Sequence, residues 1–213
     1  MLPVLVAIVI GAGLPMQTAI NSRLRMALGS PLRSSLVSFA VGTFALVAVL
    51  LLTREGFVPS GGLPSSLPWW VWIGGVLGVF FLTGNIVLFP HLGGVGTVIL
   101  PILGQILMGD VIDVLGLFGL PARALTWRLV AGTLLAAAGM VVAVVSGARV
   151  GRPSRASAGG SAGMSAGRSV GLVLWRVVGV LLGTLSAMQT AANGELGIRL
   201  GSAVRASVVS FVT

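Results

Sequence analysis

Residues 11–41 read GAGLPMQTAINSRLRMALGSPLRSSLVSFAV, and residues 183–213 repeat this stretch without a gap when the chain is displaced by 172 positions. Fifteen of the thirty-one positions are identical. The identical pairs include Met16-Gln17-Thr18-Ala19 with Met188-Gln189-Thr190-Ala191, Asn21 with Asn193, Gly29-Ser30 with Gly201-Ser202, Arg33 with Arg205, and Ser38-Phe39 with Ser210-Phe211. Apolar composition alone does not align two amides, a Gly-Ser turn and an arginine, so the chain contains an internal repeat.

The composition indicates a membrane protein. Hydrophobic residues make up 56% of the 213 residues, charged residues 8%, and the mean hydropathy is +1.09. Soluble domains carry about 25% charged residues. The net charge of +9 comes from thirteen arginines and four acids. These arginines flank apolar runs and are not interleaved with aromatic residues, which favours membrane-flanking charges over nucleic-acid binding. The chain has no cysteine, so disulfides and cysteine-based metal sites are excluded.

The apolar runs predict an all-α integral membrane protein, because a helix of about 20 apolar residues crosses the hydrocarbon core. The N-terminus has no basic region or cleavage site typical of a signal peptide, so the first run is expected to remain as a span. Residues 1–148 are expected to form a first five-helix transmembrane repeat, with spans at 1–22, 34–53, 69–90, 96–115 and 129–148. Residues 149–170, rich in Gly, Ser, Ala and Arg, predict a flexible cytoplasmic linker.

Residues 171–213 are interpreted as an incomplete second repeat, with one full helix at 177–194 and the start of another at Ala203. The second copy stops where the first still has most of its second helix ahead, so we expect a protein truncated in its second repeat. A repeat of five spans is odd in number, and its second copy must enter the membrane from the opposite side. The sequence therefore predicts the start of an inverted second repeat, a plan common in secondary transporters.

Arginine placement favours an N-terminus outside the plasma membrane, because cytoplasmic loops carry the excess of positive charge. With that orientation eight arginines lie on the cytoplasmic side and five outside. The cytoplasmic set is Arg23, Arg25, Arg33, Arg149, Arg152, Arg155, Arg168 and Arg176, and the outer set is Arg54, Arg123, Arg128, Arg199 and Arg205.

Several ordered motifs give this chain a family resemblance. They are Gln17-Thr18-Ala19-Ile20-Asn21, Leu28-Gly29-Ser30-Pro31, Ser38-Phe39 with Gly42, Pro68-Trp69-Trp70 with Gly74-Gly75, Gly104-Gln105, Asp113 with Gly116, and Arg128 with Gly132. The chain resembles the YdcZ-like branch of the drug/metabolite transporter superfamily over residues 1–148 and again over 171–213. The resemblance implies an exporter built from five-helix halves, which pair as homo- or hetero-dimers of half-transporters or are fused into ten-helix chains. It implies no particular solute.

Polar residues inside the spans are the candidate site. Gln17 and Asn21 lie four residues apart and share a helix face, and Gln189 and Asn193 repeat the pair. An amide that faces lipid has no hydrogen-bond partner, so these amides are expected to face a neighbouring helix or a cavity. Two interpretations stay open, interhelical hydrogen bonds and a solute pathway. Gln105, four residues after a proline that is expected to break its helix, is a further pathway candidate, and a structural kink without solute contact is an equal alternative.

Asp110 and Asp113 lie three residues apart near the end of the fourth span, where acids are candidates for function. Arg128 is the expected partner of Asp113, because a short loop returns the chain to the same side. The favoured interpretation is either a solvated helix end at the interface or a salt bridge, and the alternative is a proton shared between the two carboxylates. His91 is a lone histidine, expected in a solvated turn and not at a metal site. The tryptophans at 69, 70 and 72 predict a membrane-interface anchor.

The sequence thus predicts a secondary transporter that exports small organic solutes across the cytoplasmic membrane by alternating access. A non-transporting membrane scaffold or assembly subunit is the alternative. An enzyme is not expected, because the spans contain no nucleophile–base pair and no phosphate-binding loop. The lipid bilayer is the expected surrounding, with no cofactor, no metal and no nucleic acid.

Overall fold

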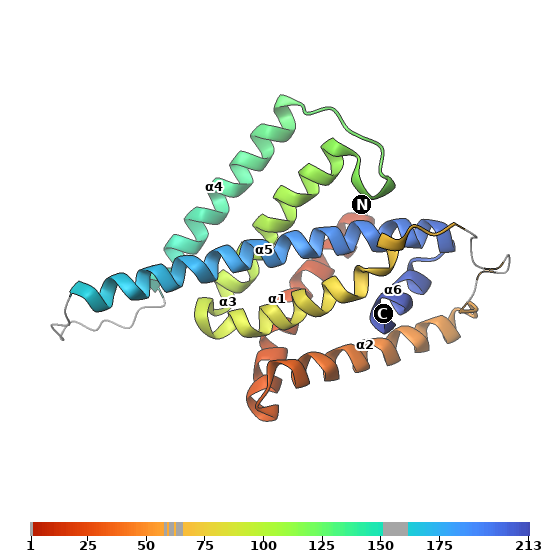
Figure 1. The fold of residues 1–213 in the computed structure, drawn as a ribbon, viewed down its shortest axis with the longest axis horizontal. Helices are drawn as coiled ribbons and strands as arrows, with labels where there is room; N and C mark the ends of the chain where they lie inside the picture. Colours follow the sequence, from red (N-terminus) through yellow and green to blue (C-terminus); the bar gives the residue numbers. More distant parts are fainter. Residues whose placement is uncertain (1, 58, 60–61, 63–65, 151–161) are drawn as a thin grey trace.

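The structure is a computed structural model that describes residues 2–57, 59, 62, 66–150 and 162–213. Over these residues it is all-helical, with six α-helices and two short 3-10 helices. The α-helices are α1 (Leu2–Leu28), α2 (Pro31–Leu52), α3 (Gly74–Leu115), α4 (Trp127–Val150), α5 (Ala162–Leu200) and α6 (Ala203–Val212), and the 3-10 helices are η1 (Trp69–Trp72) and η2 (Leu117–Gly119). Figure 1 shows α5 crossing the middle of the molecule, with α2 on one side and α4 on the other.

Five helices are long and apolar enough to cross a membrane, which confirms the predicted fold class. The third of them runs from Trp69 to Leu115 and is broken at Gly93, where the backbone adopts φ 69° and ψ 179°. Glycine adopts a positive φ without the steric cost that a side chain would add. The break divides α3 into two segments of about 20 residues each, the length that spans the hydrocarbon core. The turn predicted around residues 91–94 is thus confined to one residue.

The helix ends differ from the predicted spans in two places. α1 continues to Leu28, so Arg23 and Arg25 belong to its last turns instead of to a loop. The predicted linker 149–170 is helical at both ends, because α4 reaches Val150 and α5 begins at Ala162. Its middle, residues 151–161, lies outside the described residues. Glycine and serine lowered the helicity expected for the predicted linker, but its two helical ends also contain alanine and arginine, which are good helix formers.

The two copies of the repeated stretch have the same local structure. Gly29 and Gly201 both adopt a left-handed conformation, with φ 68° and 65°, and each ends a helix. The next residue is a serine whose hydroxyl accepts the backbone N–H of the arginine three positions on. This is the N-cap arrangement that begins a helix. The identical Leu-Gly-Ser residues therefore form the same turn, α1 to α2 in one copy and α5 to α6 in the other.

The second helices of the two copies, α2 and α6, lie against each other in opposite directions. The rings of Phe39 and Phe211 are in contact, with centroids 5.1 Å apart. At the other end, the start of α6 meets the residues after α2, where Ser202 donates a hydrogen bond to Glu55 and Arg205 donates to the carbonyl of Gly56 at 2.8 Å. Phe39 and Phe211 are equivalent positions of the repeat, so the same position of each copy meets the other in this aromatic pair.

α3 and α5 make the most intimate contact of the bundle, because two glycines allow their backbones to touch. A Cβ atom added to Gly104 would collide with the backbone oxygen of Val180, and one added to Gly183 would collide with the backbone oxygen of Pro101. The Cα atoms of the two glycines face each other across the contact. Small residues at helix interfaces permit such close packing in membranes, where no hydrophobic effect draws helices together.

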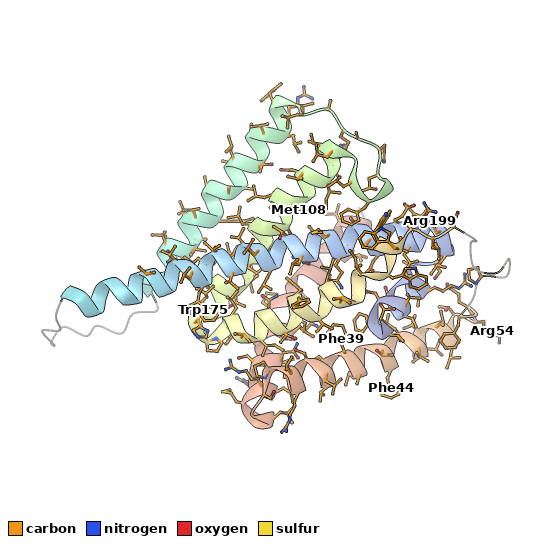
Figure 2. All side chains as sticks on the ribbon, in the orientation of Figure 1. Phe39, Phe44, Arg54, Met108, Trp175 and Arg199 are labelled. Atoms are coloured by element: carbon orange, nitrogen blue, oxygen red, sulfur yellow. The ribbon has the colours of Figure 1, made fainter. Side chains whose placement is uncertain are left out.

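The described loops sort to two ends of the bundle. Figure 2 labels Trp175, in the first half of α5, and Arg199, near the C-terminal end of the same helix. At one end Arg25 donates to the carbonyl of Ile86 at 3.3 Å, and the His91 and Trp175 rings stack 3.8 Å apart. At the other end Arg199 donates to the carbonyl of Ser66 at 3.0 Å. A cluster of Val71, Leu196, Leu200 and Ala206 is buried there. The bundle therefore has two distinct polar ends separated by apolar helix surface.

The glycine contact generates a stability prediction. Gly104→Ala should destabilise the bundle by about 1–3 kcal/mol, the usual cost of overpacking. Gly109→Ala is the matched control on the same helix, since nothing lies within 4 Å of the added methyl group. That control should be neutral or slightly stabilising, because alanine favours helix over glycine. Thermal melting of the purified proteins measures both, and equal melting temperatures for the two variants would contradict the close contact.

Candidate functional site

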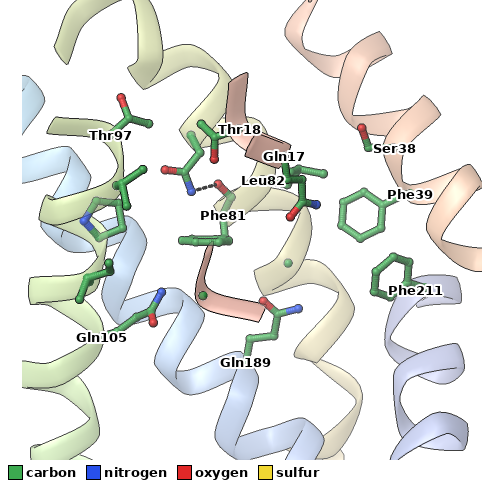
Figure 3. Close-up of a pocket in the computed structure, with 16 residues that line it drawn as sticks. Gln17, Thr18, Ser38, Phe39, Phe81, Leu82, Thr97, Gln105, Gln189 and Phe211 are labelled. Carbon is green, nitrogen blue, oxygen red and sulfur yellow. Dashed lines mark hydrogen bonds between the residues drawn. The ribbon is translucent and has the colours of Figure 1, made fainter. Parts of the chain in front are cut away.

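A cavity of about 260 Å³ opens between α1, α2, α3, α5 and α6. Its walls are apolar on most of their area and carry amide and hydroxyl groups at several points (Figure 3). The lining residues are Gly11, Gln17, Thr18, Ser38, Phe39, Gly78, Phe81, Leu82, Asn85, Thr97, Val98, Pro101, Ile102, Gln105, Gln189 and Phe211. A concave, mostly apolar pocket with a few convergent polar groups is the usual form of a small-molecule site.

Three of the predicted pathway residues, Gln17, Gln105 and Gln189, line this cavity together (Figure 3). They come from three different helices, α1, α3 and α5. The side chain of Gln105 donates a hydrogen bond to the hydroxyl of Ser186 at 3.2 Å, which orients its amide. Pro101, one turn before Gln105, also lines the cavity, but α3 is not interrupted there, because the break in this helix is at Gly93. The sequence prediction therefore identified residues that the fold brings to one place.

The cavity is lined by equivalent residues from both copies of the repeat. Gln17 corresponds to Gln189, and Phe39 corresponds to Phe211. All four lie on the cavity wall, and the two phenylalanines also touch each other. The two copies of the repeated stretch thus present the same chemical groups to a shared space.

Asn21 and Asn193 do not line this cavity. Instead, each binds the serine seventeen residues later on the next helix of its own copy. The Oδ1 atom of Asn21 accepts the Ser38 hydroxyl at 2.6 Å, and the Nδ2 atom of Asn193 donates to the Ser210 hydroxyl at 3.1 Å. Nδ2 of Asn21 and Oδ1 of Asn193 are buried without a partner among the described residues. The asparagines therefore form interhelical hydrogen bonds, while the glutamines of the same motif face the cavity.

The partner expected for Asp113 was wrong. Asp113 forms a salt bridge with Arg123 at 3.1 Å, and its carbonyl also accepts the Arg123 backbone N–H at 2.8 Å. Arg128 lies instead over the ring of Trp127, 5.8 Å from its centroid. Left-handed residues Gly116 and Phe118 turn the loop back early, which brings Arg123 to the aspartate before Arg128. The pair is exposed, and exposed ion pairs contribute about 0–1 kcal/mol.

Asp110, the second acid of this helix, accepts a hydrogen bond from the hydroxyl of Thr133 on α4. It thus joins α3 to α4, away from the cavity. His91, expected in a solvated turn, is exposed but belongs to α3, where its Nδ1 atom lies 2.9 Å from the carbonyl of Val87. Its ring stacks on Trp175 of α5. These side-chain contacts connect α3 with α4 and with α5 near the ends of the bundle.

Sequence reasoning missed Asn85, Thr97 and Phe81, which also line the cavity. Asn85 is buried, with 6% of its surface exposed, and its Nδ2 atom donates to the carbonyl of Phe81 at 3.0 Å. Its Oδ1 atom is buried without a partner among the described residues. A sequence signal for Asn85 was available, since it is a single amide in the middle of an apolar span. A polar group in lipid must find a hydrogen-bond partner or a cavity, so such an amide is a candidate for either.

The interhelical hydrogen bond of the second copy generates a prediction. Asn193→Ala and Ser210→Ala should each lower the melting temperature, and the double variant should lower it by less than the sum. The coupling should be about 0.6 kcal/mol, the average for such bonds in membranes. A double-mutant cycle by thermal melting measures it. Strict additivity of the two effects would show that the bond contributes nothing.

Comparison with known proteins agrees with the membrane fold. A family model described as "Putative inner membrane exporter, YdcZ" matches residues 2–142, which is more than half of the chain. "Inner membrane protein YdcZ" of Escherichia coli (strain K12) is 29% identical over 133 residues, covering 62% of this chain and 89% of that protein. No solved structure matches. A transporter family with several spans implies an inner membrane protein that is not an enzyme. The chain belongs to the YdcZ family of inner membrane exporters within the drug/metabolite transporters.

Proposed function

We propose that the protein exports a small organic solute by alternating access between two inverted copies of the repeated unit, with the cavity as the solute site. The observation that carries this proposal is the position of the cavity at the contact between equivalent residues, Phe39 and Phe211. In inverted-repeat transporters the substrate site lies near the bilayer midplane at the repeat interface. A site at such an interface can open to either side of the membrane by equivalent movements of the two copies.

The antiparallel contact of α2 with α6 supports the inverted arrangement. Two copies that cross the membrane in the same direction would present equivalent helices in parallel. Here the end of α6 lies beside the first half of α2, and the start of α6 lies beside the residues that follow α2. The proposal includes an N-terminus outside the membrane, which puts the turn at Gly29 on the cytoplasmic side and the turn at Gly201 outside.

Membrane topology tests the inversion directly. The chain has no cysteine, so single substitutions give unambiguous labels. Leu32→Cys and Ala203→Cys introduce a thiol at an exposed position just after each turn. A membrane-impermeant maleimide added to intact cells should label Ala203→Cys and leave Leu32→Cys unlabelled until the membrane is permeabilised. Labelling of both positions from the same side would contradict inverted repeats.

Transport assays test the solute site. Gln17→Leu and Gln189→Leu should each reduce solute flux in proteoliposomes by about tenfold or more, the equivalent of roughly 1.4 kcal/mol of lost interaction. Membrane insertion and purified yield should stay normal, because neither amide holds two helices together by a hydrogen bond within the described part of the chain. Met16→Leu is the matched control beside Gln17, since Met16 is 67% exposed on the outside of the bundle.

Parallel loss of flux and yield in the glutamine variants would assign both amides to packing instead of transport. Absence of flux for a broad solute panel, under gradients of either direction, would favour the alternative function as a membrane scaffold or assembly subunit.

A further inference from the structure

The polar groups of the cavity are all uncharged. They are the four amides of Gln17, Asn85, Gln105 and Gln189 and the hydroxyls of Thr18, Ser38 and Thr97. No ionisable side chain is among the described residues that line the cavity. An ion that enters such a space loses its hydration and finds no opposite charge to compensate for it, so the cavity disfavours ions.

The acids of the chain are held in contacts elsewhere. Glu55 accepts the Ser202 hydroxyl and lies near Arg205, and Glu195 pairs with Arg199 at 2.7 Å. The two acids of α3 bind Arg123 and the hydroxyl of Thr133. All four acids of the sequence thus have partners outside the cavity lining. A cationic solute would find no carboxylate in the cavity to serve as its counter-ion.

Asn85 presents a buried acceptor that the protein leaves unused. Its Nδ2 atom is occupied by the carbonyl of Phe81, whereas its Oδ1 atom is buried without a partner among the described residues. A buried polar atom without a hydrogen bond is unfavourable. Because this oxygen has almost no exposed surface, a solute N–H or O–H satisfies it only when the neighbouring side chains shift to admit it. The amides of Gln17 and Gln189 make no hydrogen bond to described residues and offer both donors and acceptors.

The apolar part of the wall contains three phenylalanines, Phe39, Phe81 and Phe211, together with aliphatic residues, namely Leu82, Val98, Pro101 and Ile102. Aromatic rings favour offset or edge-to-face contact with another flat ring. The cavity volume of about 260 Å³ is below the range of about 300–1,000 Å³ typical of pockets for drug-sized ligands. The walls therefore suit a small flat group that carries a hydrogen-bonding end.

We propose that the solute is a small uncharged molecule that combines a flat apolar group with an amide-like hydrogen-bonding group, and that Asn85 accepts its donor. That this solute is transported rests on the proposed function. The chemical class of the solute rests on the residues that line the cavity. The uncharged amides select against both organic cations and organic anions. The unused Asn85 oxygen selects for a solute with an N–H or O–H donor.

Equilibrium binding separates the chemistry of the site from transport. Benzamide, benzoate and benzylammonium share one ring and differ in charge, so they are the matched probes. Calorimetry at neutral pH on the full chain in lipid nanodiscs, against empty nanodiscs, should show benzamide binding at least about tenfold tighter than either ion. Preferential binding of benzoate or benzylammonium overturns the proposal, and so does the absence of binding by all three.

Two variants tie the preference to the cavity. Gln189→Glu places a carboxylate of similar shape in the wall, and the preference should shift by about tenfold or more towards benzylammonium. Asn85→Leu removes the unused acceptor, and the affinity for benzamide should fall by about tenfold while the melting temperature stays within a few degrees. Met16→Leu should leave all three affinities unchanged. An unchanged preference in Gln189→Glu would show that the probes bind elsewhere and overturn the proposal.

Flux of the same probes distinguishes this inference from the proposed function. Benzamide binding that shifts as expected in the variants, without any counterflow of radiolabelled benzamide, would contradict transport and leave the chemistry of the site intact. Counterflow of benzylammonium or benzoate in preference to benzamide would leave transport intact and overturn the neutral-solute inference.

Discussion

The backbone contact of α3 with α5 at Gly104 and Gly183 determines where the other helices lie. It brings the second copy of the repeat against the first at a distance that only glycine permits. Gln105 follows one of these glycines, and Gln189 lies about two turns beyond the other, so both amides reach the same space. The affinity of such helices for each other comes from packing and hydrogen bonds, because lipid supplies no hydrophobic driving force. The cavity is the space that remains beside this contact.

Much of the fold was predictable from the sequence because the membrane imposes simple rules. Long apolar runs predict spans, and the repeated Leu-Gly-Ser predicts the same turn twice, which the structure contains at Gly29 and Gly201. The repeat also indicated that Gln17 and Gln189 belong together, and they share one cavity. The extent of helix around residues 149–170 was less predictable. Glycine and serine in this segment favour a loop, whereas alanine and arginine in the same segment favour a helix.

Side-chain partners depended on features that periodicity does not encode. Arg123 reaches Asp113 because three residues with positive φ shorten the loop. One of them is Phe118, and phenylalanine is not a residue that predicts such a conformation. Gln17 and Asn21 share a helix face, yet Gln17 faces the cavity and Asn21 binds Ser38 of α2. The position of α2 beside the turn of α1 that contains Asn21 decides this difference. Asn85 has no equivalent in the repeated stretch, so no pattern singled it out.

The contact between Phe39 and Phe211 also says something about the origin of the chain. Each side of this contact is made by the same position of a duplicated sequence, which is the defining property of an isologous interface. A surface of that kind needs only one gene, because the unit is complementary to a second copy of itself. Joining two such genes afterwards would preserve the contact and free each half to diverge. Asn85 lies outside the repeated stretch, so the cavity also carries a polar group that the two copies of that stretch do not supply.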